Sequence, residues 1–479
     1  MLVMLTIYSP DTYIAANKFG LGLRPGEAAY IEQDPRGWLL NQLTDITAVP
    51  ARLSSLPSSA SYLACLSEDR MMMQGTRQDS NAASIRETAL RESRRAMAQD
   101  YQTHLQLRLQ TAVETEIPFA ERLLHFWSNH FSVAFSGGQK SVIRQLALPF
   151  EQEAIRANLD GDFTSLLLAV EQHPAMLIYL DNSVSIGPNS VIGKRRERGL
   201  NENLAREILE LHTLGVNAGY NQDDVTSLAK IITGWTIPEQ RIMRLPGVSV
   251  DNTTGFTYVP QLHEPGNHRL LGSTYSSRSN GLVQGEQALK DLSRHPATAR
   301  HIAEKLARHF ISDTPSQSSI SQLENTFLKT DGHLPSVHEA LITLEEAWLP
   351  QNKKLRTPQE LVTATARGME LDSAINSNRQ VVGLFTRILT SFNQMPFTAL
   401  SPAGWEDSAS YWGSPDGLMK RMEWANSIAN LTSRNSDADY LAEEILSPDA
   451  HLQQALANAE SSHQAVTLLL ASPAFQWRS

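Results

Sequence analysis

The sequence predicts a mostly α-helical protein: one large multi-helix domain with an N-terminal helical subdomain and a small irregular or β excursion. Strong helix formers with helical spacing dominate, as in residues 84–116. Runs with the period-two alternation of strands are scarce. With 479 residues, of which 41% are hydrophobic, the chain can bury a large core without disulfides or metals.

Spacing and turn residues divide the chain into four regions. Residues 1–115 are the N-terminal helical subdomain, and residues 116–236 are a central helical core that carries the candidate site. In residues 237–282, valines and aromatic residues alternate with Gly, Pro, Asn and Thr, which favours short strands or irregular structure. Residues 283–479 return to helical spacing and complete the core.

Composition and missing motifs exclude several classes of function. The chain has 41 basic and 51 acidic side chains and a net charge of −10, which argues against a nucleic-acid partner. Cys65 is the only cysteine, so there is no disulfide framework and no zinc site of paired cysteines. We find no P-loop, dinucleotide fingerprint, nucleophile elbow or HExxH helix, which argues against the chemistries that use them.

The N-terminus and the apolar runs indicate location. The first residues have no basic region before a short apolar run, so no signal peptide is expected. No run of about 18 apolar residues occurs, so no membrane span is expected. A cytoplasmic location follows by default, and a single thiol fits a reducing compartment.

The segment PFAERLLHFWSNHF is expected to begin a helix at Pro118. His130 shares one face with Phe119, Leu123 and Phe126. One interpretation is a core histidine bonded to a carbonyl or carboxylate. The other is a metal ligand or general acid–base group at a cleft wall.

The segment NENLAREILELHTLG is expected to form a helix with Asn201 as its cap and Gly215 in the left-handed position after it. One stripe of this helix carries polar side chains, namely Asn203, Arg206, Glu207 and Glu210. The stripe is either a solvated face of i,i+4 ion pairs or a carboxylate pair fixed by Arg206. Such a pair can hold a divalent cation or perform acid–base catalysis.

Two later segments add candidates. His263, with Glu264 and His268 nearby, lies in a turn-rich segment and is either a metal ligand or a surface histidine. In HPATARHIAEKLARHF, His295 precedes the first helical turn. Lys305 either meets a phosphate or carboxylate or extends along the edge of an apolar face.

Several separated motifs carry a family resemblance. They are FWSNHF at Phe126–Phe131, HPAMLIYLDN at His173–Asn182, NENLAREILELHTLGV at Asn201–Val216, YNQDDVTSLAKIITGW at Tyr220–Trp235, HPATARHIAEKLARHF at His295–Phe310, and the C-terminal SPAFQWR. In order and spacing they resemble the large bacterial family known as domain of unknown function 1800 (DUF1800), over nearly the whole chain.

The resemblance implies no established reaction, and the chain departs from the family pattern in two places. Ser128 stands where the family usually has a histidine. His263 and Glu264, with His268 and Arg269 further on, stand where it usually has His-Asp followed by a lysine. Many relatives resemble exported proteins, so the resemblance implies a periplasmic or exported location as the alternative. It also implies a protein partner of the sulfatase-like DUF1501 family.

Two hypotheses about function follow. The first is a binding or assembly protein that acts with a partner in export or envelope maturation. The second is a metal-dependent hydrolase or oxidoreductase, with the site between helices. The polar residues of the motifs would then converge on one cleft that binds a divalent metal or an anionic small ligand. The assigned roles are catalysis by Arg206, Glu207 and Glu210, ligand binding by Asn203, His295 and Lys305, and metal binding by His130, Glu207, Glu210 and His263.

Overall fold

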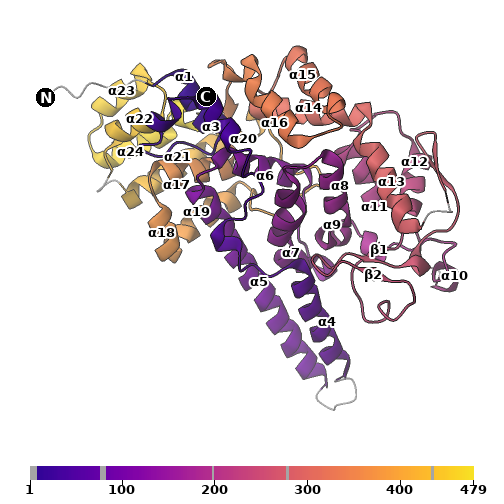
Figure 1. The fold of residues 1–479 in the computed structure, drawn as a ribbon. Coiled ribbons are helices and arrows are strands. Elements are labelled where there is room, and N and C mark those ends of the chain that lie inside the picture. Colours follow the sequence, from indigo (N-terminus) through magenta and orange to yellow (C-terminus); the bar gives the residue numbers. More distant parts are fainter. Residues whose placement is uncertain (1–7, 76–81, 197–198, 277–279, 433–435, 479) are drawn as a thin grey trace.

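Helices make up most of the chain in the computed structural model, which describes residues 8–75, 82–196, 199–276, 280–432 and 436–478. The strands in these residues are two or three residues long. The predicted mostly α-helical class is therefore confirmed (Figure 1).

The N-terminal region consists of a short-helix segment followed by a helical hairpin. Its helices are α1 (Pro10–Tyr13), α2 (Ala28–Ile31), α3 (Pro35–Asn41), α4 (Ser59–Gly75) and α5 (Ala82–Glu114). Helices α4 and α5 pack against each other and project from the body (Figure 1). Helix α5, with 33 residues, covers the predicted stretch up to Glu114, and its C-terminal end reaches back to the centre of the molecule.

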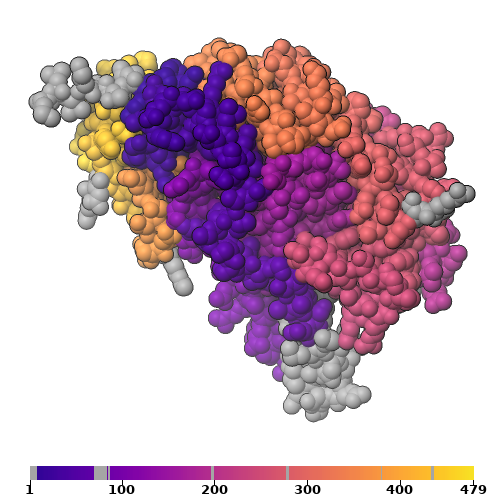
Figure 2. Space-filling view, in the orientation of Figure 1, coloured from indigo at the N-terminus to yellow at the C-terminus, as the bar shows by residue number. Residues whose placement is uncertain are grey.

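The first helices pack against the C-terminal region. Lys18 Nζ donates to the carbonyl of Ala347 at 2.6 Å, and Asn17 Nδ2 donates to the carbonyl of Ile445 at 3.3 Å. Figure 2 shows this indigo segment between the yellow C-terminal helices and the orange helices. Residues far apart in sequence therefore share one core.

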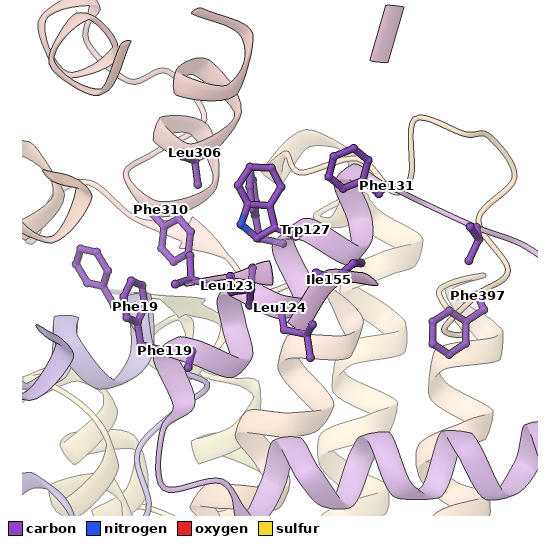
Figure 3. Packing of buried hydrophobic residues seen from close by; sticks show 14 of the residues in the cluster. Phe19, Phe119, Leu123, Leu124, Trp127, Phe131, Ile155, Leu306, Phe310 and Phe397 are labelled. Atoms are coloured by element: carbon purple, nitrogen blue, oxygen red, sulfur yellow. The ribbon is translucent and has the colours of Figure 1, made fainter. Parts of the chain in front are cut away.

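The central helices include α6, the helix of the FWSNHF motif. They are α6 (Pro118–His130), α7 (Ile143–Phe150), α8 (Phe163–Gln172), α9 (Pro174–Tyr179), α10 (Gly193–Arg196), α11 (Asn203–Glu207) and α12 (Gln222–Ile231). Helix α6 begins at Pro118 as predicted, because a first helical residue needs no amide hydrogen. Phe119, Leu123 and Trp127 on α6 are fully buried, and the ring of Phe119 packs edge-on against Phe19 and Phe310 (Figure 3).

The predicted excursion is present as two small antiparallel sheets. Its strands are β1 (Trp235–Thr236), β2 (Ser249–Val250), β3 (Thr257–Tyr258), β4 (His268–Leu270) and β5 (Ser273–Tyr275). The first sheet has the order β1-β3-β2, with Trp235 opposite Tyr258, and β4 pairs with β5.

The C-terminal region returns to helices and brings the end of the chain to the centre. Its elements are α13 (Gly281–Ser293), α14 (Pro296–Phe310), α15 (Gln317–Lys329), α16 (Leu334–Thr343), β6 (Lys354–Leu355), α17 (Pro358–Gly368), α18 (Asp372–Ser377), α19 (Arg379–Ser391), α20 (Ala409–Trp412), α21 (Pro415–Thr432), α22 (Ala438–Ile445), α23 (Ala450–Ala457), α24 (Ser462–Ala471), α25 (Pro473–Gln476) and β7 (Trp477–Arg478). Strand β7 pairs with β6, which places Arg478 opposite Lys354, just before α17.

The helix expected over residues 201–215 is shorter than predicted. Helix α11 ends at Glu207, and a π-helical turn follows at Ile208–His212. Thr213 Oγ1 donates to the carbonyl of Ile208 at 2.5 Å and so satisfies a carbonyl in the widened turn. Gly215 has φ +92°, which confirms its predicted left-handed conformation.

Candidate functional site

A polar cleft with a volume of ≈430 Å³ lies between α6, α14, α17, the end of α5 and the loop of residues 394–408. The charged and imidazole side chains that line it are Arg108, Arg122, His125, His130, His301, Lys305, Arg308, His309, Asp313, Glu360, Glu406 and Asp407. Since these residues come from five segments of the chain, the cleft exists only in the folded protein.

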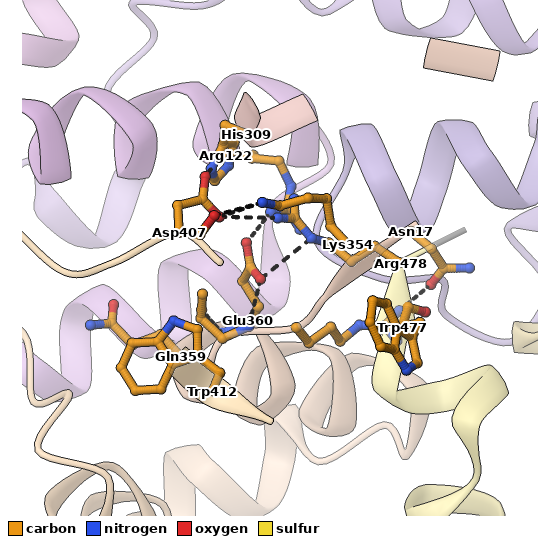
Figure 4. A network of polar contacts seen from close by, with 12 residues as sticks. Asn17, Arg122, His309, Lys354, Gln359, Glu360, Asp407, Trp412, Trp477 and Arg478 are labelled. Carbon is orange, nitrogen blue, oxygen red and sulfur yellow. Dashed lines mark hydrogen bonds and ion pairs between the residues drawn. The ribbon is translucent and has the colours of Figure 1, made fainter. Parts of the chain in front are cut away.

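A network of ion pairs forms the floor of the cleft (Figure 4). Glu360 pairs with Arg122 and, at 3.4 Å, with Arg478. Burial raises the pKa of Glu360, but the guanidinium groups of Arg478 and Arg122 outweigh burial and hold that pKa at about 2. Glu360 is therefore ionised and engaged by the protein's own cations.

Asp407 is the second carboxylate of this floor. It accepts a hydrogen bond from His309 Nδ1 at 2.7 Å, and Lys354 Nζ lies 3.2 Å from its other oxygen. Burial acts to raise the pKa of Asp407, and His309, Lys354 and Arg478 together hold that pKa well below its usual range. Lys354 also pairs with Asp313. The carboxylates at the floor of the cleft are thus paired with basic side chains of the protein itself.

A second paired group lies where α5 meets α6. Glu151 is fully buried, and its carboxylate accepts hydrogen bonds from Arg108 Nε at 3.0 Å and from Ser128 Oγ at 2.5 Å. Arg108 also donates to Gln359 Oε1 at 3.1 Å. Ser128, which stands where a histidine was expected from the resemblance, is therefore hydrogen-bonded to a buried carboxylate.

The loop that carries Asp407 is fixed to α6 by Asn129. The side-chain oxygen of Asn129 accepts from the backbone N–H of Trp405 at 2.8 Å, and its amide donates to the carbonyl of Trp405 at 3.0 Å. Gly404 has φ +79°, and a Cβ added there would lie 2.4 Å from the backbone oxygen of Asn129. A glycine is therefore required for this close approach.

Two cations of α14 in the cleft lack a carboxylate partner. Within the described ranges, no ion pair or hydrogen bond joins the side chain of Lys305 or Arg308 to another residue. Lys305 is partly buried, and burial lowers its pKa to about 8, although Asp407 opposes this shift. Arg308 is exposed, and so is Glu406, the one lining carboxylate that the described contacts leave unpaired. Lys305 is therefore the partly buried cation of the cleft without a direct carboxylate partner in the described residues.

Of the residues proposed from the sequence, His130 and Lys305 lie in this cleft. His130 is buried, donates from Nε2 to the carbonyl of His212 at 3.2 Å, and has no partner for Nδ1 in the described structure. Burial holds the pKa of His130 well below its ordinary value, and the charge of Lys305 adds to this effect. His130 is thus a neutral histidine in the cleft wall.

The polar stripe of α11 lies outside the cleft. Arg206 is 3.5 Å from Glu202 and 3.5 Å from Glu210, the i,i+4 pairs of the solvated-face interpretation. Glu207 is partly buried, and burial raises its pKa. The side chain of Asn203 is exposed, with its amide 3.5 Å from Asp181.

The other two predicted residues make local contacts outside the cleft. His263 donates from Nδ1 to the carbonyl of Thr233 at 3.0 Å. His295 caps α14 by accepting from the backbone N–H of Ala297 at 3.1 Å. The expected convergence on one cleft is therefore not found for Asn203, Arg206, Glu207, Glu210, His263 and His295.

The residues proposed as a metal site do not form one cluster. In the described residues, no group of three or more His, Cys, Asp or Glu side chains is arranged to hold a metal ion. Of His130, Glu207, Glu210 and His263, the cleft includes His130 alone.

The sequence did not single out several of the cleft residues. Arg122 lies in a helical segment that stood out by its apolar residues, and Asp407 follows a turn-rich stretch without a motif. His309 is on the flank of its predicted helix, as the spacing of His301, Lys305 and His309 indicates, but no role was assigned to it. The available signal was an excess of cations on α14, where Arg300, Lys305 and Arg308 outnumber Glu304.

Comparisons with known proteins identify a family and no characterised relative. The sequence model of a family described as "Protein of unknown function (DUF1800)" matches residues 14–477. No curated protein matches the chain. No solved structure matches it either. None of the described helices combines the length and the apolar character needed to cross a membrane.

Proposed function

The chain belongs to the DUF1800 family, and we propose that it is a binding protein for a small anionic molecule, which is held in the cleft between α6, α14 and α17. The proposed ligand class is a phosphate, sulfate or carboxylate compound. These groups form charge-assisted hydrogen bonds with lysine and arginine.

The observation that carries the proposal is the unpaired ammonium group of Lys305. A partly buried lysine without a carboxylate partner costs folding free energy, and the lowered pKa of about 8 reflects that cost. Groups kept in a cleft at such a cost are commonly functional. An anion next to Lys305 would supply the missing charge.

The surrounding charges support the same ligand class. Glu360 and Asp407 are occupied by Arg122, Arg478, Lys354 and His309, so they do not neutralise Lys305 through a direct ion pair. Arg308 lies one helical turn from Lys305 on the same face of α14 and adds a planar donor group. A single anion can therefore contact a lysine and an arginine.

Isothermal titration calorimetry with inorganic phosphate, sulfate and acetate tests this proposal. We expect binding to the wild-type protein and at least about tenfold weaker binding to the Lys305→Met variant, because a charged hydrogen bond is lost. Lys290→Met is the matched control, since Lys290 is exposed on α13, outside the cleft. Equal binding by Lys305→Met and wild type would contradict the proposal. It would also be contradicted if none of the three anions bound to the wild-type protein.

Two finer expectations stay predictions. One is a protein partner of the sulfatase-like DUF1501 family, which rests on the family resemblance. The other is a divalent metal with a hydrolase or oxidoreductase reaction, although His130, Glu207, Glu210 and His263 do not form one cluster in the described structure. The anion proposal needs neither of them.

A further inference from the structure

An apolar cavity adjoins the anion cleft. It has a volume of ≈50 Å³ and lies between α5, α17, α19 and the segment at Met395 and Pro396. Its apolar lining consists of Leu105, Leu109, Ala112, Val362, Val382, Phe385, Leu389, Met395 and Pro396. Arg108, His125, Gln359 and Thr363 line both the cavity and the cleft, so the two spaces meet at these residues.

We propose that the ligand is an anionic amphiphile, whose charged group lies beside Lys305 and Arg308 and whose short apolar chain lies in this cavity. The inference rests on the proposed anion binding and adds the chemical nature of the rest of the ligand. Short-chain alkyl phosphates, alkyl sulfates and aliphatic carboxylates belong to this class.

The lining of the cavity supports an apolar chain as its occupant. Leu105, Leu109, Val382 and Met395 are partly exposed, while Val362 and Phe385 behind them are buried. Covering the partly exposed side chains removes apolar surface from water, which favours binding. A water molecule needs about two or more polar partners, and most of this lining offers none.

The junction between the two spaces suits such a ligand. Arg108 is held by Glu151 at 3.0 Å and by Gln359 at 3.1 Å, so its position is fixed by the protein. His125 is neutral, because burial and the nearby charges of Arg108 and Arg122 hold its pKa well below the ordinary value. An apolar chain can therefore pass the neutral ring of His125 without removing a charged imidazolium from water.

The volume of the cavity limits the length of the chain. A single water occupies about 10–15 Å³ measured in the same way, so ≈50 Å³ corresponds to about three to five groups of methylene size. We therefore expect affinity to rise by about fourfold for each CH₂ group that enters the cavity, over about three to five such groups, and then to level off as the chain is lengthened further.

Calorimetric titration of the full chain with a homologous series tests the inference. The probes are inorganic phosphate and methyl, ethyl, propyl, butyl, hexyl and octyl phosphate. The cavity-filling variant is Val382→Phe, and the matched control is Val283→Phe, an equal change at an exposed position of α13. If Val382→Phe does not fold, Leu109→Phe provides the same test from α5.

The inference predicts a rise in affinity with chain length in wild type and Val283→Phe. The rise should be lost in Val382→Phe, whose affinity for inorganic phosphate should stay unchanged. Equal affinity for all chain lengths in wild type, with phosphate still bound, would overturn the inference and leave the proposed anion site standing. No binding of any phosphate would overturn both.

Discussion

Asp407 on the 394–408 loop accepts a hydrogen bond at 2.7 Å from Nδ1 of His309 on α14. The contact joins two of the segments that line the cleft, and it orients His309 with Nε2 unbonded within the described structure. Burial lowers the pKa of His309 and Asp407 opposes that shift, so near neutral pH the ring is neutral and its Nδ1 proton is directed to Asp407.

Replacing Asp407 by asparagine is expected to lower the free energy of unfolding by about 1.5–3 kcal/mol. The reason is that Lys354 and Arg478, both buried, lose a carboxylate partner. Urea denaturation of Asp407→Asn measures the change. Asp416→Asn is the control, because Asp416 forms an exposed i,i+4 pair with Lys420 and should cost no more than about 0.5 kcal/mol. Equal stability of the two variants would show that the floor network contributes little.

The floor network also predicts how stability depends on acid. The pKa of Glu360 is about 2 in the folded protein and ordinarily 4.5, so its contribution is complete above pH 4.5. The contribution should be lost as the pH falls from about 4.5 to about 2. Melting temperatures measured across this range should fall less steeply for Glu360→Gln than for wild type, and parallel curves would argue against the assigned pKa.

Removing the charge of Lys305 is expected to stabilise the fold. Its pKa is about 8 in the folded protein and ordinarily 10.5, so the charged form is disfavoured by folding and the penalty is complete below pH 8. Lys305→Met should therefore melt at a higher temperature than wild type at pH 7. The difference should shrink between pH 8 and pH 10.5, whereas Lys290→Met should melt like wild type throughout. A lower melting temperature for Lys305→Met at pH 7 would contradict this prediction.

Anion binding should weaken as Lys305 loses its proton. Sulfate is the appropriate probe because its own charge does not change between pH 7 and pH 10. We expect the affinity of wild type for sulfate to fall as the pH rises above about 8, since the neutral amine no longer attracts the anion. In Lys305→Met the weaker residual binding should be independent of pH over this interval. Calorimetric titration at several pH values provides the comparison.

Much of the fold could be predicted from local sequence. Pro118, Pro174 and Pro296 each occupy the first position of a helix, and Gly215 adopts the left-handed conformation that its place after a helix indicated. These features depend on neighbouring residues alone. The π-helical turn at Ile208–His212, in which Thr213 Oγ1 donates to the carbonyl of Ile208, was not predicted, because helical spacing of the apolar residues does not distinguish an α-helical from a π-helical turn.

The cleft could be predicted only in part. Lys305 was singled out with a phosphate or carboxylate as one of two partners, and His130 as a cleft-wall residue in one interpretation. Arg108, Glu360 and Asp407 meet them through tertiary packing, across as many as 299 positions between Arg108 and Asp407. Helical periodicity gives the face of each helix, but it does not tell which faces meet.

The most direct test of the anion site is a crystal structure of the protein grown without phosphate or sulfate and then soaked in tungstate. This anion resembles phosphate and sulfate in shape and scatters X-rays strongly. The account predicts a tungstate oxygen at roughly 3 Å from Lys305 Nζ, with the anomalous density of tungsten one bond length beyond it, beside the guanidinium group of Arg308. Tungstate bound elsewhere on the surface, with no density in the cleft at saturating concentration, would contradict the account.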